Sequence, residues 1–317
     1  MLRRCIAVLT FLVVLSLASR ARADIVFVTE MSNLAENPDA TPLLTSTGDP
    51  RPTSFGSATF TLNNTQTALS FSATVHNIDV TGTQTPDPND NLRAAHIHAG
   101  PAVTPETNAG VVFGFIGLPF NDNNPTDVVL TPFSSGVGGT VTSKWDLPEG
   151  NNTTLAAQLP NILLGRSYIN FHTVQFPGGE LRGNIRLAST TNSAVHGSGS
   201  LGGPKGNIRV NFSAFNNRKR LAGGVQFIDR FNDIRLRTTQ ITAVQVSGNM
   251  GIISGVGTVN GEQNVNFVLI VNDNTGPFNT TGDGFSLLIS NGYSIDTFFD
   301  RGRVRVSGGG EIVPPNT

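Results

Sequence analysis

The chain has 317 residues, of which 35 are Gly, 18 are Pro and 14% are charged, and its formal net charge is −1. Disordered chains combine low hydrophobicity with high net charge, and helical bundles are rich in Ala, Glu, Lys and Leu, so both classes are excluded. Frequent Gly, Asn, Thr, Ser, Val and Phe are typical of strands joined by turns. The length predicts two domains.

Residues 1–23 have the pattern of a secretory signal peptide. Arg3 and Arg4 precede an apolar run over residues 6–17, and the segment 21–23 reads Ala-Arg-Ala, a small-residue cleavage site. We therefore predict cleavage after Ala23 and a mature protein that is secreted or otherwise extracytoplasmic. The apolar run of about 12 residues is shorter than the roughly 20 that a membrane span needs, and no later segment is apolar enough.

Cleavage changes both the charge and the cysteine content. The predicted mature chain carries 17 Lys and Arg against 22 Asp and Glu, a net charge of −5, and it loses Cys5, the single cysteine. It therefore has neither a disulfide nor a thiolate metal ligand. With this charge, one Trp and two Tyr, it lacks the positive field and the stacking platforms of a nucleic-acid binder. We expect no nucleic-acid partner.

The first half of the mature chain shows alternating apolar and polar residues between turn signals. This pattern predicts strands over residues 57–62, 69–75, 111–115, 168–173 and 181–187. Residues 154–164 are an exception, because their apolar spacing predicts a short helical turn interrupted by Pro160. Short strands at this spacing are typical of a β-sandwich. We expect a first all-β domain over residues 24–188.

The second half is also predicted to be all-β. Residues 189–203, rich in Ser, Thr, Asn and Gly, are expected to form a boundary, with or without one short strand, and alternation resumes over 208–214, 265–271 and 285–289. We expect an antiparallel sandwich or barrel over residues 189–317. Residues 24–188 have a net charge of −8 and residues 189–317 one of +3. The basic residues at strand spacing predict either a solvated face or an anion-binding face: Arg235, Arg237, Arg301, Arg303 and Arg305.

The most specific motifs lie in the first half. Residues 95–101 read AHIHAGP, residues 164–173 read LGRSYINFHT, and residues 177–184 read PGGELRGN. This combination resembles the CHRD domain, a module named after its repeats in the developmental regulator chordin and also found in secreted bacterial proteins. The resemblance covers roughly residues 25–188. It implies an extracellular, immunoglobulin-like β-sandwich, and in chordin such modules belong to a protein that binds growth factors.

The motif marks a set of residues with structural roles. Gly178, Gly179 and Gly183 predict a turn with positive φ and a strand position with close packing or a bulge. Glu180 and Arg182 lie two apart, so we expect them on one face, paired across strands. Besides the histidines, the marked residues are Gly100, Tyr168, Asn170, Gly178, Gly179, Glu180, Arg182 and Gly183.

Three histidines are candidate metal ligands. His96 and His98 project to one strand face, and His172 lies on a second predicted strand. If the two strands are neighbours, the three imidazoles form a site that suits Zn or Cu, with Glu180 orienting one ring. Alternatively, the rings hydrogen-bond backbone carbonyls and shape the loop after Gly100. A His-x-His strand also occurs in copper-zinc superoxide dismutase, but the cysteine pair and the histidine-rich loop of that enzyme are missing here.

The sequence contains none of the common catalytic motifs, such as a serine elbow, a zinc-protease helix or a phosphate-binding loop. It therefore predicts an exported, non-enzymatic binding or structural protein whose partner is an unidentified extracellular protein or cell-surface ligand. The alternative is a copper- or zinc-binding protein, or a redox enzyme, that uses His96, His98 and His172.

Overall fold

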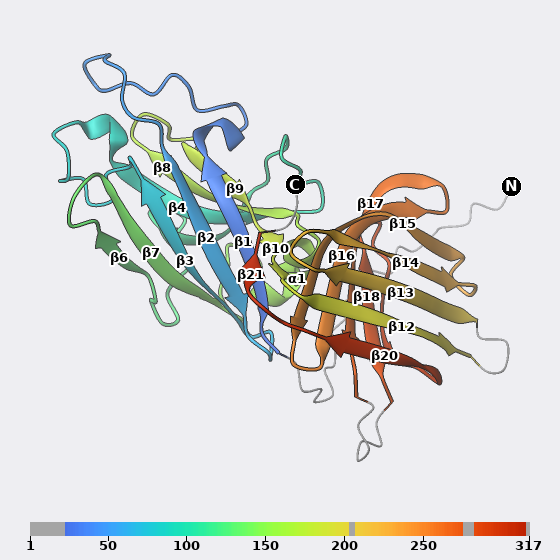
Figure 1. Ribbon diagram of the computed structural model, residues 1–317. Helices are drawn as coiled ribbons and strands as arrows, with labels where there is room; N and C mark the ends of the chain where they lie inside the picture. The colour runs from blue at the N-terminus through green and yellow to red at the C-terminus, as the bar shows by residue number, and fades with distance from the viewer. Residues whose placement is uncertain (1–22, 203–206, 275–281, 315–317) are drawn as a thin grey trace, which may run out of the picture.

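The computed structural model describes residues 23–202, 207–274 and 282–314 (Figure 1). They form two curled antiparallel sheets, which confirms the all-β, sandwich-like fold class. The predicted signal segment lies outside the described residues, except for Ala23. Among the described residues, no helix has the length and apolarity of a membrane span.

The first sheet has the strand order β5-β4-β8-β9-β1-β2-β3-β7-β6, and β10 also pairs with β1. The sheet curls until its two ends face each other across a core. The Phe113 ring of β5 stacks on Trp145 of β7 with centroids 5.1 Å apart, although β5 is the first strand of the order and β7 the last but one. The strands are β1 (Ile25–Ser32), β2 (Phe55–Leu62), β3 (Ala68–His76), β4 (Leu92–Ala99), β5 (Val111–Ile116), β6 (Val129–Pro132), β7 (Gly138–Asp146), β8 (Ser167–Thr173), β9 (Leu181–Asn184) and β10 (Arg186–Leu187).

The helix α1 (Leu155–Leu163) confirms the helical prediction for residues 154–164, but it runs through Pro160, so the predicted interruption is wrong. Thr154 caps the helix by accepting a hydrogen bond from the Ala157 N–H at 3.3 Å. Proline removes one hydrogen bond from the helix, but the apolar face of α1 is packed into the core, and that burial offsets the loss. The buried residues are Leu155, Leu159, Ile162 and Leu163. Two short 3-10 helices, η1 (Asn33–Ala35) and η2 (Pro88–Asp90), complete the helical content of the described residues.

The second sheet has the order β19-β18-β17-β16-β15-β14-β13-β12-β20, a meander whose last strand returns to the first. A separate pair, β11 (Ser189–Thr190) with β21 (Ile312–Val313), lies between the two sheets (Figure 1). The strands are β12 (Ser193–Leu201), β13 (Ile208–Asn216), β14 (Leu221–Asp229), β15 (Ile234–Ser247), β16 (Met250–Val259), β17 (Glu262–Asn272), β18 (Gly284–Ile289), β19 (Ser294–Phe298) and β20 (Arg301–Ser307).

The predicted boundary at 189–203 is thus mostly a nine-residue strand, β12, paired on both sides. The glycines of β12 interrupt the alternation of apolar and polar residues that predicts a strand. They are required because aromatic rings of the core lie against this strand. A Cβ on Gly197 would lie 2.4 Å from the Phe212 ring, and one on Gly199 would lie 2.1 Å from the Phe299 ring. The rings therefore fill the inward positions where side chains of β12 would otherwise stand.

The two sheets pack against each other through a buried junction. Apolar residues on the outer side of β15, β16 and β17 join the core of the first sheet, and Gln245 hydrogen-bonds both backbone groups of Val26 and the Ala188 carbonyl. Arg166 donates to the Ser290 carbonyl at 2.8 Å. The apolar residues of the second sheet at this junction are Ala243, Met250, Ile252, Val268 and Ile270.

Candidate metal centre

The strands β4, β8 and β9 place the motif residues on one face of the first sheet. Directly opposed residues of antiparallel strands project to the same side. His98 is opposite Tyr168, and His96 is opposite Asn170, which in turn is opposite Arg182. His172 follows on the same side, opposite Ala94. We call these residues the polar face: His96, His98, Tyr168, Asn170, His172 and Arg182.

The three histidine rings converge within this face. His96 Nδ1 lies 3.1 Å from His172 Nε2, and one ring nitrogen from each of His96, His98 and His172 lies within 4.8 Å of the others. Three atoms with this separation share a point about 2.8 Å from each (4.8 Å divided by the square root of three), and a zinc–nitrogen bond is about 2.0–2.1 Å. Small ring movements of less than about 1 Å therefore bring all three nitrogens to bonding distance.

Backbone carbonyls orient two of the rings. His98 Nδ1 lies 2.9 Å from the Ala109 carbonyl oxygen, and His172 Nδ1 lies 3.0 Å from that of Pro177. A carbonyl oxygen only accepts, so each Nδ1 carries the hydrogen and each Nε2 keeps its lone pair. Metal-bound histidines commonly donate their second ring N–H to such a carbonyl. The carbonyl contacts and a metal site, which the sequence left as alternatives, are therefore compatible.

Burial keeps these rings neutral. Their exposed fractions are 4% for His96 and 7% for His98 and His172. Loss of hydration lowers the pKa of His96 and of His98 to about 4 and also lowers the pKa of His172, and neighbouring imidazoles add to this effect at His96 and His98. Nε2 of His96 and Nε2 of His98 are buried without a hydrogen-bond partner. Unprotonated, desolvated nitrogens are the form in which imidazole binds metals.

The other residues of the polar face hold the loop at 102–109 over the histidines. The Tyr168 ring stacks on His98 with centroids 4.6 Å apart, and its hydroxyl contacts the backbone of Ala109. The Arg182 guanidinium lies 3.8 Å from the centre of the Tyr168 ring. Arg182 also donates to Asn108 Oδ1 and to the carbonyls of Thr104 and Thr107. The loop, the ring stack and the histidines thus form one packed unit.

Glu180 does not orient a histidine, so that prediction is wrong. Its carboxylate forms a buried ion pair with Arg51 and accepts a hydrogen bond from the Thr173 hydroxyl. The predicted cross-strand pairing of Glu180 and Arg182 is also absent, because loops cover this face and supply the partners of both side chains. Arg51 lies in one such loop, far from Glu180 in sequence.

Two of the motif glycines are required by their surroundings. Gly179 has a φ of +130°, and a Cβ there would lie 2.6 Å from the Asn170 amide and 2.7 Å from Glu36. A Cβ on Gly183 would lie 2.3 Å from Thr29 Oγ1 and 2.5 Å from the Glu30 carbonyl oxygen. Gly178 faces open space and Gly100 meets only ordinary contacts, so neither carries such a constraint.

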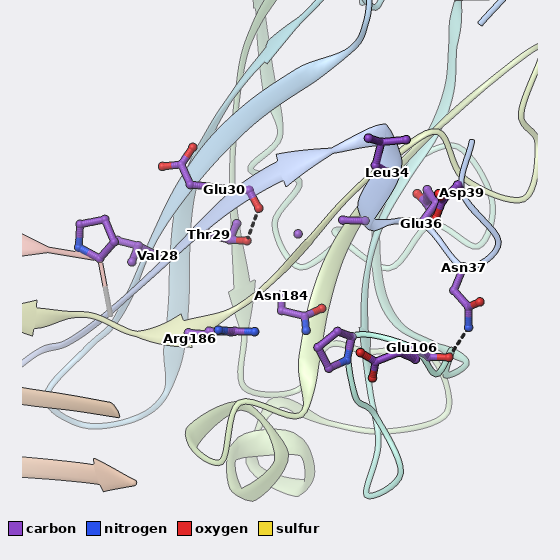
Figure 2. Close-up of a pocket in the computed structure, with 14 residues that line it drawn as sticks. Val28, Thr29, Glu30, Leu34, Glu36, Asn37, Asp39, Glu106, Asn184 and Arg186 are labelled. Atoms are coloured by element: carbon purple, nitrogen blue, oxygen red, sulfur yellow. Dashed lines mark hydrogen bonds between the residues drawn. The ribbon is translucent and has the colours of Figure 1, made fainter. Parts of the chain in front are cut away.

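Glu36 is the polar residue of this region that sequence reasoning missed. It is 7% exposed, its Oε1 has no partner, and its Oε2 lies 3.4 Å from Asn170 Nδ2. Burial raises the pKa of its carboxyl group to about 7. It lines a cavity of about 450 Å³ next to β9, together with Glu30, Asp39, Glu106 and Arg186 (Figure 2). A single acid in a polar loop offers no sequence signal for such a position.

Comparison with known proteins gives one result. Residues 35–185 match the family model of the CHRD domain. Comparison with curated proteins and with solved structures finds no match. The matched range spans β2 to β9 and contains the whole polar face, so the motifs that carry the resemblance are the residues that build the candidate site. Residues 35–185, just under half of the chain, therefore form a CHRD domain.

Proposed function

We propose that the CHRD domain of this protein binds one copper or zinc ion through His96, His98 and His172. The observation that carries the proposal is the convergence of three buried ring nitrogens within 4.8 Å of one another. Without an ion, a desolvated lone pair in this cluster lacks a partner, as at Nε2 of His98. Copper and zinc are among the ions that imidazole ligands favour.

The ion has a structural role in this proposal. The imidazoles are almost fully buried, and the loop at 102–109 is tied over them by Tyr168 and Arg182. An ion there would join β4, β8 and this loop in the folded state only, so its binding energy would stabilise the fold. We therefore favour a binding or structural module over a redox enzyme, which needs an accessible coordination position.

Metal analysis of the protein purified without a histidine tag tests the proposal. We expect about one equivalent of Cu or Zn per chain, and its loss in His98→Gln. The matched control is His196→Gln, because His196 is exposed on the second sheet and hydrogen-bonds Ser213. Folded wild-type protein that takes up no metal after dialysis against Zn²⁺ or Cu²⁺ would rule out the site. Metal-dependent superoxide turnover would replace the structural role with a redox one.

The family match supports a second function, recognition of an extracellular protein or a cell-surface ligand. CHRD domains are extracellular modules, and the predicted signal segment would deliver the chain to that compartment. Cross-linking of the purified mature chain in secreted material, followed by mass spectrometry, tests this function. We expect one recurrent partner, and its loss when the loop at 102–109 is shortened. Labelling that is spread evenly over many proteins would count against specific recognition.

A further inference from the structure

Five neighbouring strands of the second sheet, β20, β12, β13, β14 and β15, present a polar outer face to solvent. The strand registers align this face in three rows, each running across the strands. The first row is Arg301, Ser200, Arg209, Ile228 and Arg235; the second is Arg303, Ser198, Asn211, Gln226 and Arg237; the third is Arg305, His196, Ser213 and Gly224. We call these positions the arginine face.

The charge of this face has one sign. Six of its positions are Arg, one is His and none is Asp or Glu. The arginines are exposed, whereas the alternate residues of the same strands, such as Val304 and Val210, are buried in the core. The carboxylate of Asp233 contacts Arg235 at 3.9 Å from the turn before β15, at the margin of the face. The positive field therefore extends across the sheet.

The spacing of the arginines fits a polymer whose anionic groups repeat along its length. Residues two apart along a strand are separated by about 6.8 Å, and neighbouring strands by about 4.8 Å, so the arginines of β20 and β15 are about 19 Å apart across the sheet. Each guanidinium offers a planar fork of donors that matches sulfate and carboxylate oxygens. The Ser, Asn and Gln side chains between them add neutral donors and acceptors.

We propose that the arginine face binds a linear anionic polysaccharide that carries sulfate or carboxylate groups. The face bears no aromatic side chain on which nucleic-acid bases could stack. Ile228 is its one large apolar side chain, so it lacks the buried anchors that protein interfaces and membrane insertion require. A flexible, hydrophilic polyanion needs neither feature. The inference is independent of the metal centre, which lies in the other sheet.

Binding of the mature chain to dextran sulfate, with uncharged dextran as the reference polymer, tests the proposal at physiological salt. We expect wild-type protein to bind dextran sulfate and not dextran. The triple substitution Arg301→Gln, Arg303→Gln and Arg305→Gln removes three contacts of about 0.5–1 kcal/mol each, so affinity should fall about 10- to 150-fold. Polygalacturonate, assayed in parallel, distinguishes a carboxylate polymer from a sulfated one.

A charge-matched control separates the face from net charge. Arg218, Lys219 and Arg220 form the exposed tip between β13 and β14, outside the three rows. Converting these three residues to Gln removes the same charge, and we expect less than about a twofold change in affinity. Urea unfolding of both variants verifies that the fold is intact, since every substituted side chain is exposed.

Four outcomes would overturn the proposal. Wild-type protein that binds none of the anionic polymers excludes it. Equal losses of affinity in the two triple variants would show that binding depends on the net charge of the protein and not on the arginine face. Tighter binding to phosphatidylglycerol vesicles than to dextran sulfate, through the same arginines, would assign the face to a membrane surface. Self-association that disappears in the β20 variant would assign it to a second copy of the chain.

Discussion

The polar face of the CHRD domain and the arginine face of the second sheet arise from the same sequence pattern. In both, polar residues alternate with core residues along neighbouring antiparallel strands. The first is covered by loops, so its histidines are at most 7% exposed, whereas the second meets solvent. Alternation therefore identifies the side of a strand that faces away from the core, but it does not reveal whether that side is exposed to solvent or covered by loops.

Burial gives the two faces different chemistry. In the polar face, burial keeps the histidines neutral and the Arg182 guanidinium donates to neutral loop groups. Several polar atoms there lack partners, among them Asn170 Oδ1 and Arg182 Nε. In the arginine face, water screens like charges, so several arginines can lie side by side. A buried polar layer thus selects a specific ligand or ion, whereas an exposed one offers many weak contacts.

The largest contrast is expected for ion pairs. In Glu180→Ala, Arg51 keeps its buried charge without a carboxylate partner, and we expect a loss of about 3–5 kcal/mol in the free energy of unfolding. Urea titration at pH 7 measures it. The exposed pair Asp233–Arg235 is the control. Asp233→Asn removes the charge, tolerates the positive φ of 49° at this position and should leave the midpoint unchanged. Equal effects of the two substitutions would contradict the contrast drawn above.

Glu36 should make the stability depend on pH. Its pKa is raised from 4.5 to about 7 in the folded state, so the native protein binds the proton more tightly than the unfolded chain does. The stabilisation of the folded state by protonated Glu36 is fully present below pH 4.5 and is lost as pH rises through 7. Glu36→Gln should therefore be more stable than wild type by about 3 kcal/mol at pH 8, and nearly equal to it at pH 4.5.

Comparison of the two proteins by urea titration from pH 4.5 to 8 isolates this group, because other titrating residues are common to both. Glu106→Gln is the control, since Glu106 lies at the exposed rim of the same cavity. A stability difference between Glu36→Gln and wild type that stays constant over this range would show that Glu36 does not titrate as described.

A smaller effect is expected at the junction of the sheets. Gln245→Ala leaves Val26 N–H, Val26 C=O and Ala188 C=O without their side-chain partner, which should cost about 2 kcal/mol. Thermal unfolding followed by circular dichroism measures the change. Gln226 is the matched glutamine on the arginine face, and Gln226→Ala should be neutral. A neutral Gln245→Ala would mean that water replaces these hydrogen bonds.

Much of the strand pattern could be predicted from local alternation, as at residues 208–214 and 285–289. The buried junction between the two sheets also has a recognisable sequence pattern. In β17, Phe267, Leu269 and Val271 enter the core of the second sheet, while Val268 and Ile270 join the core of the first. A run that is apolar on both sides indicates a strand buried on both faces. Alternation within residues 265–271 predicts one buried face, whereas Val268 and Ile270 make the second face buried as well.

The candidate site could be predicted only in part. Spacing by two places His96 and His98 on one face, but the pairing of β4 with β8 joins segments that are remote in sequence, and no local pattern encodes it. The partners Arg51 and Glu36 come from irregular loops, where propensity is uninformative. Gly197 and Gly199 are likewise required by aromatic rings that are distant in sequence, and these contacts exist only in the assembled sheet.

The return of the last strand to the first has a consequence for the timing of folding. β20 pairs with β12 across about 100 intervening residues, and β10 pairs with β1 across a still longer stretch. Each sheet is therefore completed by the strand that is synthesised last. Closing such long loops is entropically slow, so the chain should stay open while it is being made and close only once each unit has been produced in full.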